Sequence, residues 1–242
     1  MKETGIIMSG DLIPSMLDGR KTQAMFPMKP QPERWLADHL DSGFRQMVHF
    51  GEGLWGAACT QGDVSACRGE DTIRCPYGKP GDRLYVRETW QAYDPGVGPV
   101  VLGARMRCYA HPAVEGESEI EYRADYPERT ITWRPSIHMP KWAARIWLEI
   151  TGVRVERAQD ISEEDAIAEG VQYVVDKFAR CDDGTMDSCE QMALSLDPRR
   201  TFSLLWDTLN AKRGYSWESN PFVWVIEFKK PIVTETGHDH CG

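Results

Sequence analysis

The stretch "KPGDRLYVRETWQAY", residues 79–93, decides the fold that the sequence predicts. A Pro-Gly turn precedes alternating apolar and polar residues, the period of a strand with one buried face. Leu84 and Val86 lie on that face, and Glu88 interrupts it with a carboxylate. Because an unpaired buried charge is costly, Glu88 is expected either to pair with an arginine such as Arg145 or to serve in a binding cleft.

The same alternation extends outward from this stretch. It predicts further strands at residues 100–110, 119–124, 144–158 and 222–228. Two helices are marked by their ends: Ser162 opens one with a variant capping box and Gly170 ends it, and the other spans 201–214. A short apolar helix near the N-terminus is predicted to end at Gly19. Many short strands with few helices predict an α+β protein built on a small β-barrel with flanking helices.

The chain is predicted to form one domain over residues 1–232. Its 242 residues suffice for one large domain with insertions. Residues 27–80 and 176–200 are rich in proline, glycine or polar residues and are predicted to be loop-rich insertions. Residues 233–242 are predicted to be a flexible tail.

The charge balance limits the partners. The net charge of −9 argues against a broad footprint on extended duplex DNA, which calls for a basic surface. A pocket for one nucleotide needs only a few local cations, and some of the nine tryptophans offer faces on which bases stack. No apolar run reaches the roughly 18 residues of a membrane helix, and the N-terminus lacks a signal-peptide core, so no membrane partner and a cytoplasmic location are expected.

The spacing of the cysteines does not match that of a zinc site. Seven cysteines are present, but none forms the close pair that structural zinc sites use. The terminal stretch 238–241, His-Asp-His-Cys, offers ligands at a predicted frayed end, where adventitious binding is expected. No P-loop, zincin or nucleophile-elbow motif occurs. We therefore expect no metal and no cofactor.

Three stretches carry a resemblance to a known family. They are "GRKT" (19–22), "PGDRLYVRE" (80–88) and "ISEEDAIAEGV" (161–171). In this order the chain resembles the ASCH family, a branch of the PUA-like β-barrel superfamily. The longer phrases "CPYGKPGDRLYVRETW", "RPSIHMPKWAARI" and "NPFVWVIEF" resemble a larger subgroup found in phages and prophages, which implies the cytoplasm of a bacterial host.

The resemblance implies a cleft between barrel and helices that receives RNA or a nucleotide. The smallest ASCH proteins include amidohydrolases that remove the acyl group from N4-acetylcytidine with a lysine, a threonine and a glutamate. Lys21 and Glu169 occupy the lysine and glutamate positions, whereas Ala24 stands at the threonine position and Phe26 at that of a following arginine. Because a methyl group is no nucleophile, a catalytic role for this site depends on Thr22 as a substitute hydroxyl.

Other candidate ligand-binding residues carry a structural alternative. Arg20 lies beside Lys21 at the expected cationic edge of the cleft, although cations after a helix also suit the helix dipole. Trp90 is either a stacking platform or a core residue. Arg134 and Lys141 flank prolines and tryptophans in the stretch 132–142, a composition typical of phosphate and base contacts. These cations are predicted to cluster with Lys21 in one concave patch.

Three functional hypotheses follow. The first is binding of a nucleotide, modified nucleoside or short single-stranded RNA by a phage or prophage accessory protein. The second is an amidohydrolase acting on N4-acetylcytidine-like nucleosides. The third is a phage assembly protein with a vestigial cleft. Ala24 favours binding over hydrolysis, and the retained Lys21 and Glu169 argue against a vestigial cleft.

Overall fold

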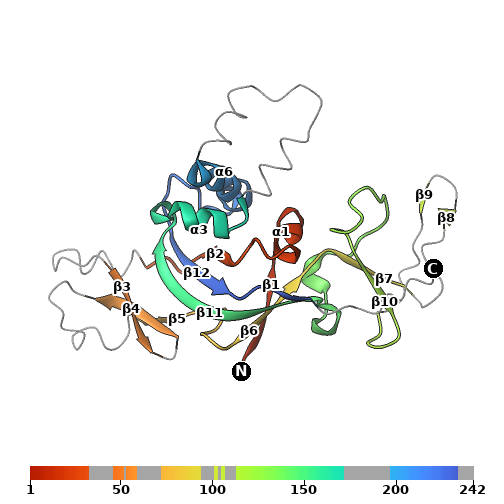
Figure 1. The fold of residues 1–242 in the computed structure, drawn as a ribbon, viewed down its shortest axis with the longest axis horizontal. Helices are drawn as coiled ribbons and strands as arrows, with labels where there is room; N and C mark the ends of the chain where they lie inside the picture. Colours follow the sequence, from red (N-terminus) through yellow and green to blue (C-terminus); the bar gives the residue numbers. More distant parts are fainter. Residues whose placement is uncertain are drawn as a thin grey trace, which may run out of the picture.

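The computed structural model of the chain describes residues 1–32, 46–51, 53–58, 72–93, 101–102, 105–106, 113–171 and 197–233. It is a mixed α+β structure organised on one six-stranded sheet (Figure 1). In spatial order the strands are β1 (Glu3–Ile7), β6 (Arg83–Arg87), β11 (Ile146–Arg157), β12 (Phe222–Phe228) and β2 (Gln23–Pro27), with β13 (Ile232–Val233) also paired to β11. β1 runs parallel to β6, and the other neighbours are antiparallel.

β11 is the long curved strand that bends this sheet (Figure 1). Its first part pairs with β6 and β13, and its second part pairs with β12 over seven residue pairs. The register shifts between Ile150 and Gly152, as at a β-bulge. A Cβ at Gly152 would collide with the carboxylate of Glu227, so a larger residue here would displace that side chain.

The pairing path of this sheet is open. It ends at β1 on one side and at β2 on the other, and no pairing of these two strands occurs among the described residues. The closed barrel predicted from the sequence is therefore not observed. The predicted strand 83–93 is also interrupted: β6 stays in the main sheet, whereas β7 (Trp90–Tyr93) pairs with β10 (Glu119–Tyr122) in a separate ribbon. The break falls at Glu88, the charged residue on the apolar face.

The predicted insertion at 27–80 contains further short strands. Within 27–80, a three-stranded antiparallel sheet comprises β3 (Gln46–Gly51), β4 (Leu54–Ala58) and β5 (Thr72–Arg74). The ring of Trp55 packs edge-on against that of Trp224 at 6.1 Å, which joins this sheet to the main core. In place of the predicted strand 100–110, β8 (Val101–Leu102) pairs with β9 (Arg105–Met106). Most of the insertion at 176–200 and of the tail lies outside the described residues.

The helices are short. Within the described ranges they are α1 (Ile13–Leu17), α3 (Glu163–Ala168) and α6 (Pro198–Asn210), with 3-10 helices at Gly10–Leu12, Ser136–His138, Lys141–Ala143, Ala158–Asp160 and Ala211–Arg213. The Ser162 hydroxyl accepts a hydrogen bond from the backbone N–H of Asp165 at 3.0 Å, so the predicted cap is confirmed. Gly170 follows α3 with φ of +84°, as expected for a helix-ending glycine.

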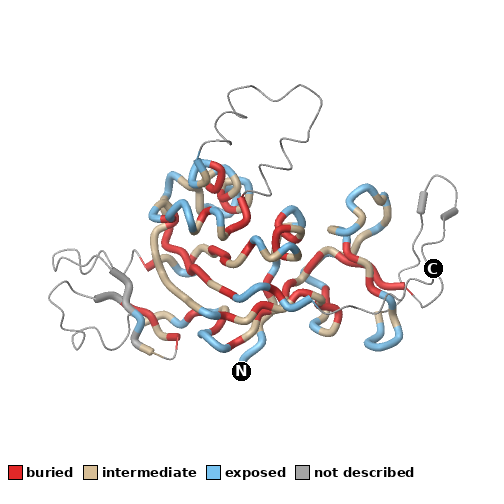
Figure 2. The backbone as a smooth tube through the Cα atoms, in the orientation of Figure 1, coloured by how far each residue is buried: buried red, intermediate tan, exposed pale blue. Residues whose placement is uncertain are grey.

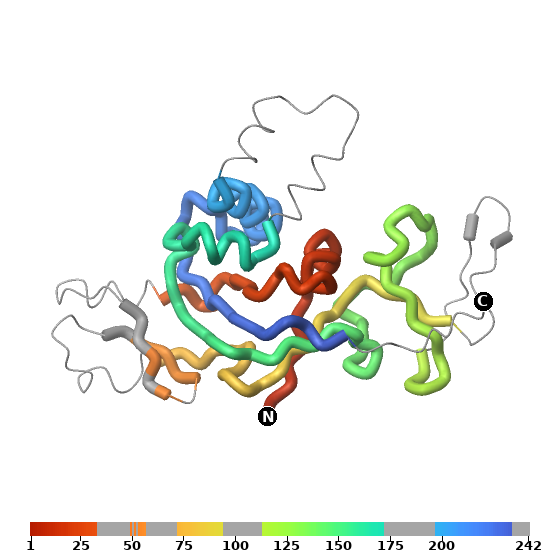
Figure 3. Tube along the Cα trace, in the orientation of Figure 1, coloured from red at the N-terminus to blue at the C-terminus, as the bar shows by residue number. Residues whose placement is uncertain are grey.

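The core has three parts (Figure 2). The largest lies on one face of the sheet, where Leu84 and Val86 meet Trp224 of β12. The second lies between the other face of β12 and the helices α3 and α6, where Val225 meets Trp206. A third surrounds the ribbon, and it contains the residues Trp90, Ala92, Ile120, Tyr122, Met139, Ala143 and Ala144. β12 is therefore buried on both faces. It pairs with β2, so a strand near the N-terminus and a strand near the C-terminus lie side by side, with α6 above them (Figure 3).

None of the helices in the described ranges combines the length and the apolar character that crossing a membrane demands.

Candidate functional site: a buried lysine–glutamate pair under a pocket

The segment between α1 and β2 is held by backbone hydrogen bonds from both sides. The carbonyl of Ser15 in α1 accepts hydrogen bonds from the N–H groups of Arg20 and Lys21, both at 2.9 Å. The N–H of Thr22 donates to the carbonyl of Ala168, the last residue of α3, also at 2.9 Å. This stretch therefore connects the end of α1 to the end of α3, and it places Lys21 beside Glu169.

Lys21 and Glu169 form a buried ion pair although 148 residues separate them in the sequence. The Nζ of Lys21 donates to Oε2 of Glu169 at 2.5 Å and to the Glu169 backbone carbonyl at 2.9 Å. The two side chains expose only 1% and 5% of their surfaces. The pair that the resemblance picked out is thus brought together at a position where charges are costly to bury.

Gly170 makes this close approach possible. A Cβ at this position would lie 2.8 Å from the hydroxyl oxygen of Ser15 and 3.3 Å from the Cβ of Lys21. Its positive φ is also a conformation that side-chain-bearing residues rarely adopt. Glycine therefore ends α3 and lets Glu169 reach the lysine.

The carboxylate of Glu169 keeps an unused hydrogen-bond acceptor. Its Oε1 is buried and has no hydrogen bond of good geometry among the described residues, although the backbone N–H of Met25 lies near enough to the carboxylate to interact with it. Burial raises the pKa of Glu169, and Lys21 together with the backbone N–H of Met25 opposes that rise. The carbonyl of Thr22 and the N–H of Met28 form hydrogen bonds with β12. Because the backbone groups of successive residues in a strand point to alternate sides, the N–H of Met25 points to the opposite, open edge of β2. Two of the three N–H donors of Lys21 are engaged, so the pair retains donor and acceptor capacity.

A pocket of about 360 Å³ lies over this pair. It is bordered by Lys21, Glu169 and the outer edge of β2, by the end of β1, and by one face of α6. β1 and β2 are the two ends of the open sheet path, so the pocket occupies the side where a closed barrel would have joined them. The open edge of the sheet is therefore part of the site.

Aromatic side chains and two cations line the upper part of this pocket. Phe26 and Tyr77 stack with ring centroids 4.4 Å apart, and Trp206 of α6 contributes a further aromatic wall. Lys29 and Arg213 are exposed at the rim, and the Nζ of Lys29 lies 5.7 Å from the centroid of the Tyr215 ring. Burial raises the pKa of Tyr77 to about 12, so its hydroxyl is neutral and can donate a hydrogen bond.

Sequence reasoning named Phe26 only as a departure from the family pattern, and it missed Tyr77, Trp206 and both rim cations as site residues. The Lys-Arg-Gly ending of the predicted helix 201–214 is the one sequence feature that pointed to Arg213.

The other residues proposed near Lys21 have different surroundings. Arg20 forms an exposed ion pair with Asp18 at 2.7 Å and does not line the pocket. Thr22 bonds to Ala168 and, through its carbonyl, to the N–H of Phe228, and it also lies outside the pocket lining. Ala24 is buried and borders the pocket directly. The methyl group, rather than a hydroxyl, therefore stands at the site.

Glu88 forms an ion pair with Arg145, which is the structural role predicted for it from the sequence. Arg145 donates from Nε to Oε1 at 3.0 Å and from a terminal nitrogen to Oε2 at 2.9 Å, and it also binds Asp125. Burial raises the pKa of Glu88, and Arg145 opposes that rise. Trp90 is 2% exposed and belongs to the third core cluster, which is the structural alternative for this residue.

Arg134 and Lys141 are not placed with Lys21, which corrects the predicted cationic patch. The guanidinium of Arg134 lies over the ring of Trp90 at 5.0 Å, and backbone hydrogen bonds join the two residues. Lys141 forms an ion pair with Glu3 near the start of β1. Both cations are held by tertiary partners around the ribbon, and neither borders the pocket of Lys21.

An arginine anchors α3 to the sheet. Arg154 of β11 donates to Oδ1 of Asp165 in α3 at 2.6 Å and to Oε1 of Gln23 at the start of β2 at 3.2 Å. It also forms an ion pair with Glu227 of β12. These contacts fix the helix that carries Glu169 to the strand that follows Lys21.

Among the described residues, no three of the side chains of His, Cys, Asp and Glu lie together so as to hold a metal ion. Cys75, the one cysteine in the described part of the chain, is buried and unpaired, and burial raises the pKa of its thiol. The tail 238–241 lies outside the described residues. Comparison with known proteins gives no match to a family model, to a curated protein or to a solved structure.

Proposed function

We propose that this chain binds a pyrimidine nucleoside or nucleotide, free or within a short single-stranded RNA, in the pocket above Lys21 and Glu169. The observation that carries the proposal is the buried pair itself, which borders the pocket and in which Oε1 of Glu169 has no well-formed hydrogen bond among the described residues. A buried polar atom of this kind is costly unless something binds it. The N–H groups of a base edge are donors of the type that a carboxylate accepts.

The rest of the lining supports the same class of ligand. The stacked Phe26 and Tyr77 offer aromatic surface, and base–aromatic stacking contributes about 1–3 kcal/mol per base. Lys29 and Arg213 at the rim supply the positive charge that a phosphate requires, despite the net charge of −9. The resemblance to the ASCH family supports this choice of ligand, together with a PUA-like origin of the sheet and the role of a phage or prophage accessory protein in the host cytoplasm.

Hydrolysis of an N-acylated pyrimidine nucleoside is the second candidate. It is favoured by the 2.5 Å contact of an amine and a carboxylate whose pKa burial raises, an arrangement suited to proton transfer. Ala24 at the pocket wall opposes it, because no hydroxyl nucleophile lies at that position. Binding without turnover is therefore the main proposal.

Calorimetric titration with cytidine, N4-acetylcytidine and cytidine 5′-monophosphate tests the proposal. Lys29→Gln and Arg213→Gln change only exposed side chains, and each is expected to weaken the monophosphate without weakening the nucleoside. Lys141→Gln is the matched control, since it removes a lysine that lines neither this pocket nor its rim. If the wild type binds none of the three ligands, the proposal is wrong and the assembly-protein hypothesis takes its place. Rapid deacetylation by the wild type would favour the hydrolase instead.

A further inference from the structure

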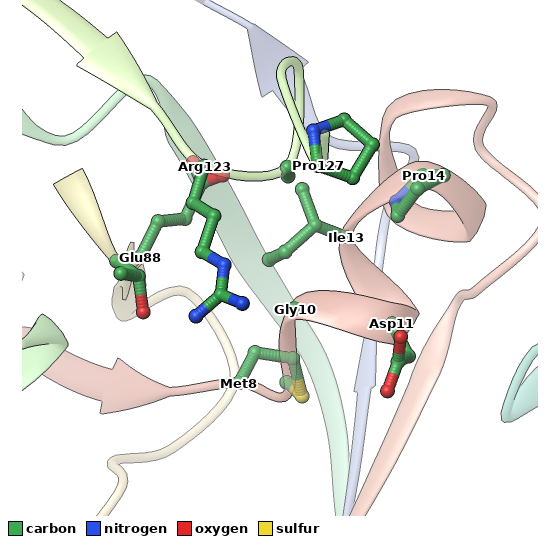
Figure 4. Close-up of a pocket in the computed structure, with 10 residues that line it drawn as sticks. Met8, Gly10, Asp11, Ile13, Pro14, Glu88, Arg123 and Pro127 are labelled. Atoms are coloured by element: carbon green, nitrogen blue, oxygen red, sulfur yellow. The ribbon is translucent and has the colours of Figure 1, made fainter. Parts of the chain in front are cut away.

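A second pocket, of about 460 Å³, lies between the N-terminal segment and the ribbon (Figure 4). One side is formed by Met8, by the 3-10 helix Gly10–Leu12 and by the start of α1. The other side is formed by Glu88, Thr89 and the turn that follows β10. Its volume, like that of the pocket over Lys21, falls in the range of sites for one small ligand.

The two pockets share a wall. Met8 borders both of them. Beyond it the chain alternates, since Ser9 and Leu12 line the pocket of Lys21 whereas Asp11 and Ile13 line the second pocket. The segment from β1 to α1 therefore borders both pockets, and Met8 lies between them.

The second pocket contains a cation whose donors are unused. The N–H of Arg123 donates to the carbonyl of Thr89 at 2.9 Å, which fixes the base of the side chain. The guanidinium extends into the pocket toward Met8 (Figure 4), and no hydrogen bond or ion pair engages it within the described residues. No ion pair joins it to Glu88 among the described residues, and the charge of Glu88 is already balanced by its bidentate pair with Arg145. Arg123 therefore presents open donors to an anion, with Asp11 as the other carboxylate in the lining.

We propose that the ligand is a single-stranded RNA of at least two nucleotides, with one nucleotide over Lys21 and the next in the pocket of Arg123. In this arrangement the guanidinium of Arg123 binds a backbone phosphate as the strand crosses Met8. A guanidinium is suited to this role because its planar donors match phosphate oxygens. The proposal rests on the proposed function of the Lys21 pocket and deepens it. Each nucleotide lies in its own pocket, so a single strand with unstacked bases fits and a stacked duplex does not.

The test compares ligands of increasing length at fixed salt. Cytidine 5′-monophosphate, dicytidylate and hexacytidylate are titrated into the wild type, Arg123→Gln and Arg74→Gln. Arg74 is an exposed arginine of β5 that lines neither pocket, so its variant is matched in charge. We expect dicytidylate to bind the wild type about tenfold more tightly than the monophosphate. Arg123→Gln should remove that gain and leave the monophosphate unchanged, whereas Arg74→Gln should keep it.

Salt dependence gives a second readout. For hexacytidylate, Arg123→Gln should lower the slope of log K against log salt by about 0.7, the value for one phosphate contact on a single strand. If the monophosphate binds but length brings no gain, or if the gain survives in Arg123→Gln, the two-pocket proposal is overturned while the proposed function stands. If no cytidine ligand binds at any length, both fail.

Discussion

Removing the charge of Lys21 should expose how the buried pair is balanced. Lys21→Met keeps much of the side-chain volume and leaves Glu169 without its cation at a site exposing 5% of the side chain. Breaking a buried pair in this way costs about 3–5 kcal/mol. Glu169 can limit the loss by taking up a proton, which costs about 4 kcal/mol at pH 7 and about 1 kcal/mol at pH 5 for a carboxyl of pKa about 4.3.

The sign of the pH dependence follows from this proton uptake. Burial already raises the pKa of Glu169, and losing Lys21 removes the main opposing interaction. The folded variant then holds a proton that the unfolded chain releases above about pH 4.3, so its stability falls as the pH rises. We expect Lys21→Met to be destabilised by about 4 kcal/mol at pH 7 and by about 1 kcal/mol at pH 5, relative to wild type at the same pH.

Urea unfolding followed by tryptophan fluorescence at both pH values measures these differences. Glu169→Gln should also destabilise the chain by about 3–5 kcal/mol, because it leaves the lysine as an unpaired buried cation. The double variant Lys21→Met with Glu169→Gln removes both charges, and we expect it to be more stable than either single variant. Additive losses in the double variant, or equal losses at pH 5 and pH 7, would refute this account of the pair.

Two further predictions concern Gly170, which follows Glu169, and Asp82 in the turn before β6. Gly170→Ala should lower the free energy of unfolding by about 1–3 kcal/mol, because alanine is strained at the positive φ of this residue and its Cβ would lie 2.8 Å from the Ser15 hydroxyl oxygen. An unchanged urea midpoint would contradict this prediction. The backbone N–H of Lys2 lowers the pKa of Asp82, so this carboxylate stabilises the fold above about pH 4 and the contribution is lost as the pH falls further. Asp82→Asn should therefore flatten the loss of stability between about pH 4 and pH 2, and an equally steep loss would count against it.

The sequence predicted those elements whose own residues carry the signal. The capping serine at 162 and the glycine at 170 bound α3, and an almost continuous run of apolar residues marks β12. β1 and β2 have no such pattern: each spans five residues, and their strand character comes from pairing with β6 and β12. The open path could not be read from periodicity either, because alternation describes the faces of a strand and not the identity of its neighbours.

The site divides in the same way. Lys21 and Glu169 could be named because short stretches around them resemble a family pattern, and the structure brings the two side chains together. The cations that line the two pockets could not be identified from the sequence. Lys29, Arg123 and Arg213 come from separate segments, and only the tertiary structure brings them to the pockets. Arg134 was predicted to contact the ligand because prolines and tryptophans surround it in the sequence, yet its guanidinium lies over the ring of Trp90.

Restoring a hydroxyl at residue 24 separates the binding and hydrolase proposals. Ala24 is 2% exposed, borders the pocket and lies on the edge strand that leads away from Lys21. Ala24→Thr places a potential nucleophile in the lining of the pocket that the amine of Lys21 and the carboxylate of Glu169 also border, and such a pair activates a hydroxyl that comes within hydrogen-bond reach. Threonine suits a β-strand, but it adds volume and a hydroxyl at a buried core position, so we expect a loss of stability of about 1–3 kcal/mol.

With N4-acetylcytidine, the wild type is expected to bind without appreciable turnover, and Ala24→Thr to release acetate above background. Ala24→Val is the matched control, because it has the shape of threonine without the hydroxyl. Hydrolysis by Ala24→Thr that disappears in Ala24→Val, and again when Glu169→Gln is added, would establish that the pair is competent and lacks only its nucleophile. Equal turnover in all of these proteins would show that the hydroxyl is irrelevant. A complete lack of turnover in Ala24→Thr, with ligand still bound, would mean that the pair serves recognition alone.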